Sequence, residues 1–186
     1  EHINIESSLW KDMEKRVVTK YPSFVPPIHM IPHEIMAKSS LMVNEYGNIK
    51  LAITVLSEIN TSTYEPMGSI KLLFTKIKVD SENALSYTKA GADVENNETL
   101  QYALQISKAL YHIRSGKTKG TILNEVSISF PRRNDNSMYL YADSQTEISM
   151  KQMIAEYAIF ANTFIGEYLK INFDGAGVFR SCNAKD

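Results

Sequence analysis

The segment from residue 149 to residue 170 constrains the fold of this chain more than any other part of the sequence. It contains no proline, and its apolar residues lie on almost every side of a helix instead of forming one stripe. A helix that is apolar nearly all round is covered by other elements. We therefore predict a long buried helix here, around which the rest of the chain packs.

The other periodic segments predict an α+β fold, in which an antiparallel or mixed sheet packs against several helices. Alternating apolar residues predict a half-buried strand at residues 49–55, and residues 68–79 predict its antiparallel partner. A second hairpin is predicted from residues 126–130 and 138–141, joined by a polar turn at 132–136. Helical spacing predicts further helices at residues 8–17, 33–42, 86–90 and 98–113.

Length and charge limit the classes of protein to consider. A chain of 186 residues is long enough for a single domain with a core of its own. Twenty Lys and Arg residues against twenty-one Asp and Glu residues give a net charge of −1, so any nucleic acid must bind at a local patch. No apolar run approaches the roughly 18 residues that a membrane-spanning helix requires, and we expect no membrane partner.

Residues that ordinarily carry metal or nucleophilic chemistry are scattered in this sequence. His29 and His33 have the spacing of two metal ligands on one helical face, but Pro32 interrupts that helix and no third ligand follows. The single cysteine, Cys182, has no neighbouring His or Asp that would activate it as a nucleophile. The seven aspartates are spread along the chain, so none of them forms the cluster that two-metal phosphoryl chemistry needs.

Tyrosines near basic residues are the remaining signal, because single-stranded RNA binds by stacking of its bases and by positive charge along its backbone. The chain has ten tyrosines, and we consider three that have basic neighbours in the sequence. The alternative is that these rings are half-buried packing residues. The three groups are Tyr21 with Lys15, Arg16 and Lys20, Tyr87 with Lys78 and Lys89, and Tyr111 with Arg114, Lys117 and Lys119.

Seven short segments follow one another in an order that points to an enzyme family. They are residues 8–21, 28–34, 40–41, 50–55 (Lys-Leu-Ala-Ile-Thr-Val), 84–87 (Ala-Leu-Ser-Tyr), 153–162 (Met-Ile-Ala-Glu-Tyr-Ala-Ile-Phe-Ala-Asn) and 178–180 (Val-Phe-Arg). In this order and spacing they resemble the middle of the catalytic RNB domain of the ribonuclease II / ribonuclease R family of 3′→5′ exoribonucleases. The resemblance covers nearly the whole chain.

This resemblance implies a function and three site residues. Single-stranded RNA would enter a channel 3′ end first and be hydrolysed with Mg²⁺ to nucleoside 5′-monophosphates. Tyr87 and Glu156 match the tyrosine and the glutamate that the family uses near the 3′-terminal ribose, and Tyr21 falls near a family aromatic on the RNA path. The alternative for Glu156 is a helix carboxylate tied to a neighbouring Arg or Lys.

The family's catalytic aspartates lie upstream of the first helix, and its catalytic arginine lies downstream of residues 178–180. We therefore expect residues 1–186 to be a partial RNB domain that is cut from a longer enzyme and is inactive alone, with its Mg²⁺ ligands outside this section. Departures at Val17, Val18, Lys50 and Ala155 are similar to a divergent mitochondrial degradosome branch. That likeness implies an RNA helicase partner and a location in the mitochondrial matrix.

Two other functions remain open at this point. The chain could be part of an RNB-fold relative that has lost its acids and only binds RNA for regulation. It could also be an α+β interaction domain whose likeness to the family is accidental.

Overall fold

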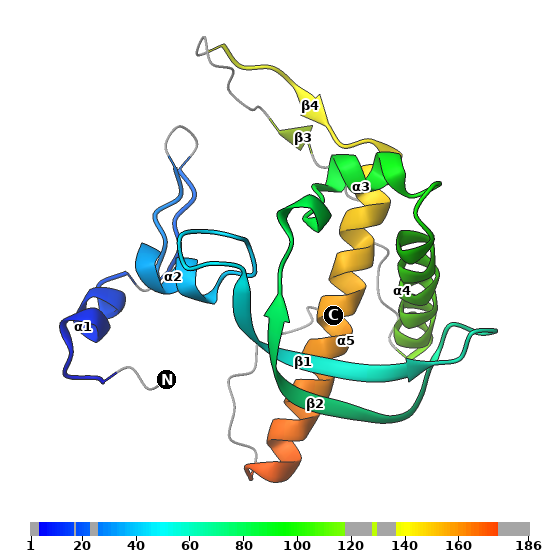
Figure 1. Ribbon diagram of the computed structural model, residues 1–186, viewed down its shortest axis with the longest axis horizontal. Coiled ribbons are helices and arrows are strands. Elements are labelled where there is room, and N and C mark those ends of the chain that lie inside the picture. The colour runs from blue at the N-terminus through cyan, green and yellow to red at the C-terminus, as the bar shows by residue number, and fades with distance from the viewer. Residues whose placement is uncertain (1–3, 17, 23–25, 118–127, 130–136, 175–186) are drawn as a thin grey trace, which may run out of the picture. The chain divides into compact units, whose positions relative to one another are not determined.

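The computed structural model describes residues 4–16, 18–22, 26–117, 128–129 and 137–174 (Figure 1). Their contacts gather in two compact units, where length alone had suggested one domain. Unit 1 comprises Glu1–Ile53 with Phe74–Ala84, and unit 2 comprises Thr54–Leu73 with Leu85–Asp186. The secondary structure is α+β with a long last helix, which confirms the predicted fold class. The two units are described in turn.

Unit 1 begins with two short helices. Helix α1, Ser8–Glu14, starts at Ser7, whose hydroxyl accepts a bond from the Trp10 backbone N–H at 3.2 Å. It ends before the predicted residue 17, where β-branched residues of low helix propensity follow. Helix α2, His33–Ser39, follows Pro32. It stops short of the predicted residue 42 because Ser40 is extended and its hydroxyl accepts from the Met42 backbone N–H.

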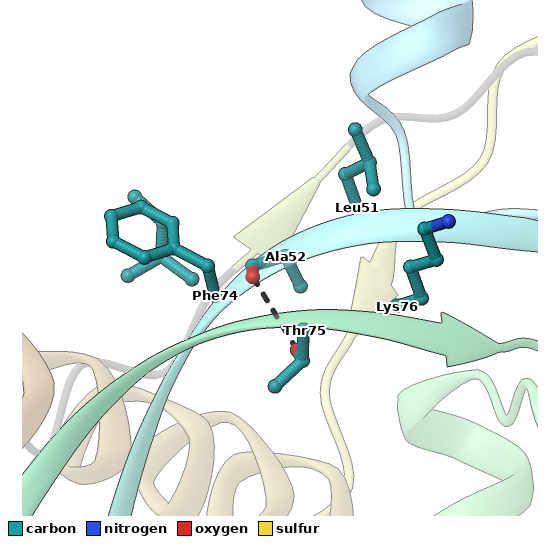
Figure 2. A pocket seen from close by; sticks show the side chains of 6 residues that line it. Leu51, Ala52, Phe74, Thr75 and Lys76 are labelled. Atoms are coloured by element: carbon teal, nitrogen blue, oxygen red, sulfur yellow. Dashed lines mark hydrogen bonds between the residues drawn. The ribbon is translucent and has the colours of Figure 1, made fainter.

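Strands β1, Ile49–Ile59, and β2, Pro66–Lys78, pair as an antiparallel two-stranded sheet that passes through both units. Within unit 1 the pair is held by bonds such as that from the Thr75 hydroxyl to the Ala52 carbonyl, drawn in Figure 2. The first predicted strand, 49–55, ends four residues too early, and the second, 68–79, begins two residues late and ends one residue late. The 3₁₀ helix η1, Ser81–Asn83, follows β2 after an Asp80 cap.

The burial of β1 is opposite to what its alternation predicts. Leu51 and Ile53 are exposed, at 75% and 61%, whereas Lys50 is 3% exposed. The Lys50 ammonium is accommodated because it donates to the Asn44 side-chain oxygen at 2.8 Å, while the Asn44 amide donates to the Ala37 carbonyl at 2.6 Å. Lys50 is therefore buried against the Asn44 turn, and the apolar side chains Ile49, Leu51 and Ile53 on the other face are left exposed.

Unit 2 is built on helix α5, Gln145–Asn172, with α3, Tyr87–Asp93, and α4, Glu98–Lys117, packed against it (Figure 1). Helix α5 starts four residues before the predicted position, at a capping box. In this box the Ser144 hydroxyl accepts from the Glu147 backbone N–H, and the Glu147 carboxylate accepts from the Ser144 N–H. The second predicted hairpin is confirmed where it is described: β3, Ile128–Ser129, pairs antiparallel with β4, Tyr141–Ala142, and its turn lies outside the described residues.

The core of unit 2 lies where α3 and α4 meet the first half of α5. Ala90, Met150 and Met153 are buried, and six partly buried residues pack around them: Leu85, Val94, Leu100, Ala103, Leu104 and Tyr157. The Tyr157 hydroxyl also donates to the Ala103 carbonyl at 3.0 Å, and burial raises the pKa of this phenol. α3 sits so close to α5 that a Cβ added at Gly91 would lie 3.0 Å from the Thr146 hydroxyl oxygen.

The prediction of a helix covered on all sides is corrected, because four residues of α5 are buried and all four lie in its first half. Its buried residues are Glu147, Met150, Met153 and Glu156, which follow one another at intervals of three. Ile154 and Ile159, which lie within the segment predicted to be buried, are exposed. Among the residues described, the buried apolar side chains are Ala37, Ala90, Leu110, Met150 and Met153. None of the described helices is long and apolar enough to cross a membrane.

Candidate functional site

A groove of about 370 Å³ runs between α4 and α5 and is lined in part by Glu156, one of the predicted site residues. α4 contributes Leu104, Ser107, Lys108 and Tyr111, and α5 contributes Ser149, Gln152, Met153 and Glu156. Each set follows the spacing i, i+3, i+4, i+7, which places four residues on one face of a helix. The groove is therefore formed by two facing helix surfaces, with a mainly apolar floor and polar groups along its length.

Glu156 and Arg114 form an ion pair across this groove. Arg114 Nε donates to Glu156 Oε2 at 3.0 Å, and Arg114 Nη2 donates to Glu156 Oε1 at 2.5 Å. Both carboxylate oxygens are thus engaged by one planar guanidinium, the two-point geometry that only arginine offers. This hydrogen bonding raises the pKa of Arg114, against the opposing effect of desolvation. Glu156 is buried, so the pair is not a loose surface contact.

The ion pair also borders a second cavity, of about 410 Å³, on the side of α4 and α5 that faces β2. This cavity is lined mainly by apolar side chains, namely Pro66, Ile70, Leu110, Ile113, Ile159, Phe160 and Phe164, with Thr163 and Glu167. Arg114 and Glu156 line both spaces. The pair therefore stands where two cavities meet.

Tyr111 lies beside the ion pair, as its sequence neighbourhood with Arg114 suggested. The Arg114 guanidinium carbon is 5.3 Å from the centre of the Tyr111 ring, and the His112 ring meets the Tyr111 ring edge-on at 5.9 Å. The Tyr111 ring thus restricts the positions that the guanidinium can take.

Tyr87, the first residue of α3, has a lysine that the sequence did not indicate. The Lys151 ammonium on α5 is 5.8 Å from the centre of the Tyr87 ring, and the same ammonium lies 2.5 Å from Asp143 Oδ2. The bond to Asp143 raises the pKa of Lys151. The Tyr87 ring is 43% exposed, so part of it is open to a ligand.

Next to this cluster, Glu147 is held by three donors. The Thr88 hydroxyl donates to Oε1, the Tyr141 hydroxyl donates to the same oxygen at 2.6 Å, and the Ser144 N–H donates to Oε2 at 2.9 Å. These bonds lower the pKa of Glu147 to about 2, and the bond from Thr88 has the largest effect. The hydrogen bond between Tyr141 and Glu147 raises the pKa of Tyr141. So many bonds identify Glu147 as a structural carboxylate that joins α3, β4 and α5.

The structure does not gather the three predicted site residues into one contact set. Tyr21 belongs to unit 1, is 77% exposed and follows Lys20, whose backbone pairs with Ile28. Tyr87 contacts Lys151 of α5, and Glu156 is itself a residue of α5. Residues 151 and 156 are five apart, which turns them about 140° from each other around the helix. Lys151, which contacts Tyr87, and Glu156 therefore project from different sides of α5.

Of the metal and nucleophile candidates that the sequence contains, the structure describes the two histidines. His33 Nε2 is 3.9 Å from Glu45 Oε1 at an exposed position. The residues described contain no group of three His, Cys, Asp or Glu side chains that could hold a metal ion. Cys182 and residues 178–180 lie outside the described residues, as do Val17 and Lys119.

Sequence reasoning missed Arg114 and Lys151 as partners, because each pairs with a residue distant along the chain. The open alternative for Glu156, a carboxylate tied to an arginine or lysine, does describe the geometry, but nothing local singled out Arg114. The Ser144–Glu147 capping box was the one missed feature with a readable signal, a serine followed three residues later by a glutamate.

Comparison with known proteins leaves these positions without a family assignment. No family model matches the chain, and no curated protein matches it. What can be inferred about function therefore depends on the residues themselves and on their geometry.

Proposed function

We propose that this chain is a section of the RNB domain of a processive 3′→5′ exoribonuclease of the ribonuclease II / ribonuclease R type, where it forms part of the wall that holds single-stranded RNA. The order of the seven matching segments supports the family. The observation that carries the site is Glu156, a buried carboxylate fixed by Arg114 on the wall of the α4/α5 groove. It stands at the position that matches the family's ribose-contacting glutamate.

The chemistry of Glu156 suits recognition of a ribose. A carboxylate accepts at about four lone-pair positions, and Arg114 occupies two of them. A 2′-hydroxyl that reaches the groove can donate to one of the remaining positions, whereas deoxyribose has no such donor. A hydrogen bond to a charged group contributes about 1.5–3 kcal/mol, which corresponds to roughly 10- to 150-fold in affinity.

Tyr87 supplies a surface for base stacking in this proposal. Its half-exposed ring and the Lys151 ammonium combine an aromatic face with positive charge, as single-strand binding requires. The same arrangement occurs in unit 1, where the Lys38 ammonium lies 5.4 Å from the Tyr46 ring. Geometry alone therefore does not distinguish Tyr87, and its place in the Ala-Leu-Ser-Tyr segment is what favours it.

The described residues do not fit a Mg²⁺ site. Asp143 is engaged by Lys151 and Glu147 by three donors, and the described residues hold no group of three His, Cys, Asp or Glu side chains that could bind a metal ion. We propose that the Mg²⁺ ligands and the hydrolytic step lie outside this section. An RNA helicase partner and the mitochondrial matrix stay predictions of the resemblance.

The test uses the protein purified from its native source, incubated with 5′-labelled single-stranded RNA and Mg²⁺. We expect products that shorten from the 3′ end, with release of nucleoside 5′-monophosphates. RNA that is bound but stays full length would contradict an exoribonuclease and favour the RNA-binding regulator. Absence of both binding and cleavage would contradict both and leave the interaction domain.

The site assignment is tested separately with Glu156→Gln. We expect this variant to lose preference for RNA over DNA of the same sequence, by about 10-fold or more, in a fluorescence anisotropy titration. Glu98→Gln makes the same chemical change at an exposed position of α4 and should keep the preference. An unchanged preference in folded Glu156→Gln would refute the ribose role.

A further inference from the structure

We infer that Arg114 is a positioning residue that sets ribose specificity by holding the Glu156 carboxylate in one orientation. The inference rests on the ribose role proposed above for Glu156 and names a residue that acts through it. Arg114 comes from α4 and Glu156 from α5, 42 residues apart in the sequence. The orientation of the acceptor is therefore fixed by the packing of the two helices.

The two-point geometry is what gives Arg114 this role. The parallel bonds at 3.0 Å and 2.5 Å place the carboxylate and the guanidinium in a fork-to-fork arrangement. A single lysine ammonium would allow the carboxylate to rotate about its last bond, since it acts as a point charge. With arginine, the lone pairs that are not used by the guanidinium point in fixed directions.

The Arg114 side chain is itself restrained. Its guanidinium carbon lies 5.3 Å from the centre of the Tyr111 ring, which is one turn earlier on the same helix. A cation that packs on an aromatic face keeps fewer rotamers than one surrounded by water. The restraint therefore extends from Tyr111 through Arg114 to Glu156.

A tie between α4 and α5 alone does not explain the pair. The Tyr157 hydroxyl already joins α5 to the Ala103 carbonyl of α4, and apolar residues pack around Met153 between the same helices. A purely structural pair has no need to border open space, yet Arg114 and Glu156 line two cavities of about 370 and 410 Å³. The pair is thus both anchored by the fold and within reach of a ligand.

The test compares a short RNA with versions that carry a single 2′-deoxynucleotide at each of the last four positions. The readout is the dissociation constant of the deoxy-substituted RNA divided by that of the unmodified RNA. This ratio is taken at the position where the wild-type protein discriminates between the two. We expect Arg114→Gln to lower this ratio by about 10-fold, as Glu156→Gln does, and Arg114→Lys to retain only part of it. Lys170→Gln removes a positive charge at an exposed position of α5 and should lower affinity for all oligonucleotides equally.

Arg114→Lys keeps a positive charge beside Glu156 and so keeps the inference testable if Arg114→Gln unfolds, and a double variant tests the ribose role of Glu156 if Glu156→Gln unfolds. In Arg114→Met with Glu156→Met the two charged groups are replaced together, which a fold usually tolerates better than one unpaired buried charge. We expect this variant to fold, judged by circular dichroism, and to have no ribose preference.

Three outcomes separate the possibilities. If Arg114→Gln and Arg114→Lys keep the wild-type ratio while Glu156→Gln loses it, the positioning role is refuted and the ribose role of Glu156 stands. If the double variant keeps the preference, or if Glu156→Gln does, both fail together. The inference is supported if the ratio for Arg114→Lys lies between those for wild type and Arg114→Gln. Lysine keeps the positive charge but lacks the two-point geometry, so a role that needed the charge alone would leave Arg114→Lys like wild type.

Discussion

The close approach of α3 to α5 predicts that one chemical change, glycine to alanine, will have opposite effects at two helical positions. At Gly116 of α4 a new Cβ meets nothing within 4 Å. At Gly91 of α3 it would lie 3.0 Å from Thr146 Oγ1, 3.1 Å from Thr146 Cβ and 3.3 Å from the Thr146 carbonyl carbon. The last of these is backbone, so rotating the threonine side chain cannot remove the whole conflict.

The magnitudes follow from these surroundings. Alanine in place of glycine in a helix gains about 0.5–1 kcal/mol, mainly because the unfolded chain is less free. Gly116→Ala should therefore raise the free energy of unfolding by that amount. Crowding a packed contact costs about 1–3 kcal/mol, which exceeds the gain at Gly91. Gly91→Ala should lower the free energy of unfolding by up to about 2 kcal/mol.

Urea unfolding followed by circular dichroism at 222 nm measures both effects. With a slope of about 1–3 kcal/mol per molar urea, the midpoints of the two variants should differ by roughly 1 M. Gly91→Ala combined with Thr146→Gly supplies a control, since it removes the threonine side chain and should recover part of the loss. The reasoning is refuted if Gly91→Ala stabilises the protein as much as Gly116→Ala does.

Three further predictions concern the core, the pH dependence and RNA binding. Met150→Ala should lower the free energy of unfolding by about 2–5 kcal/mol in urea titrations, because Met150 is the most deeply buried large side chain described, whereas exposed Met42→Ala should change it by less than about 0.5 kcal/mol. The folded-state pKa of Glu147 is depressed, from 4.5 to about 2, so its contribution to stability is present above pH 4.5 and is lost as the pH falls toward 2; Glu147→Gln should flatten the pH dependence of the urea midpoint in that window, and an unaltered slope would contradict the bonding described. Tyr87→Ala should weaken RNA binding by about 1–3 kcal/mol in anisotropy titrations at fixed salt, while Tyr46→Ala, which has a similar exposure of 42% and a similar lysine, should not; equal losses would remove the special role of Tyr87.

The sequence predicted elements well where a single segment contains its own signal. Helices α4 and α5 follow from long apolar periodicity, and α1 follows from Ser7 as a cap. The start of α5 was placed too late because apolar spacing begins only after the polar first turn, although the capping box marks that turn. Local patterns thus determine which segments form helices better than they determine where the helices begin.

The sequence predicted less where partners come from distant segments. Alternation in β1 indicates two faces but not which of them is covered. Lys50 is buried because the Asn44 side-chain oxygen accepts a hydrogen bond from its ammonium group. Glu156 was selected by its motif, yet its partner Arg114 is determined by how α4 packs against α5. Such pairings depend on tertiary structure, which no window of neighbouring residues encodes.

The uncovered apolar face of the hairpin has a consequence for the behaviour of the chain in solution. Leu51, Ile53 and Phe74 are exposed on strands of a two-stranded sheet, and the described residues add no third strand at either edge. An edge with free backbone groups beside exposed apolar side chains is a template for pairing with other chains. Residues 49–57 contain no proline and a single charged residue, Lys50, which is turned inward and so cannot act as a gatekeeper against such pairing. The weight-average mass of the isolated chain, measured by light scattering, should therefore increase with protein concentration. Leu51→Lys should suppress this increase.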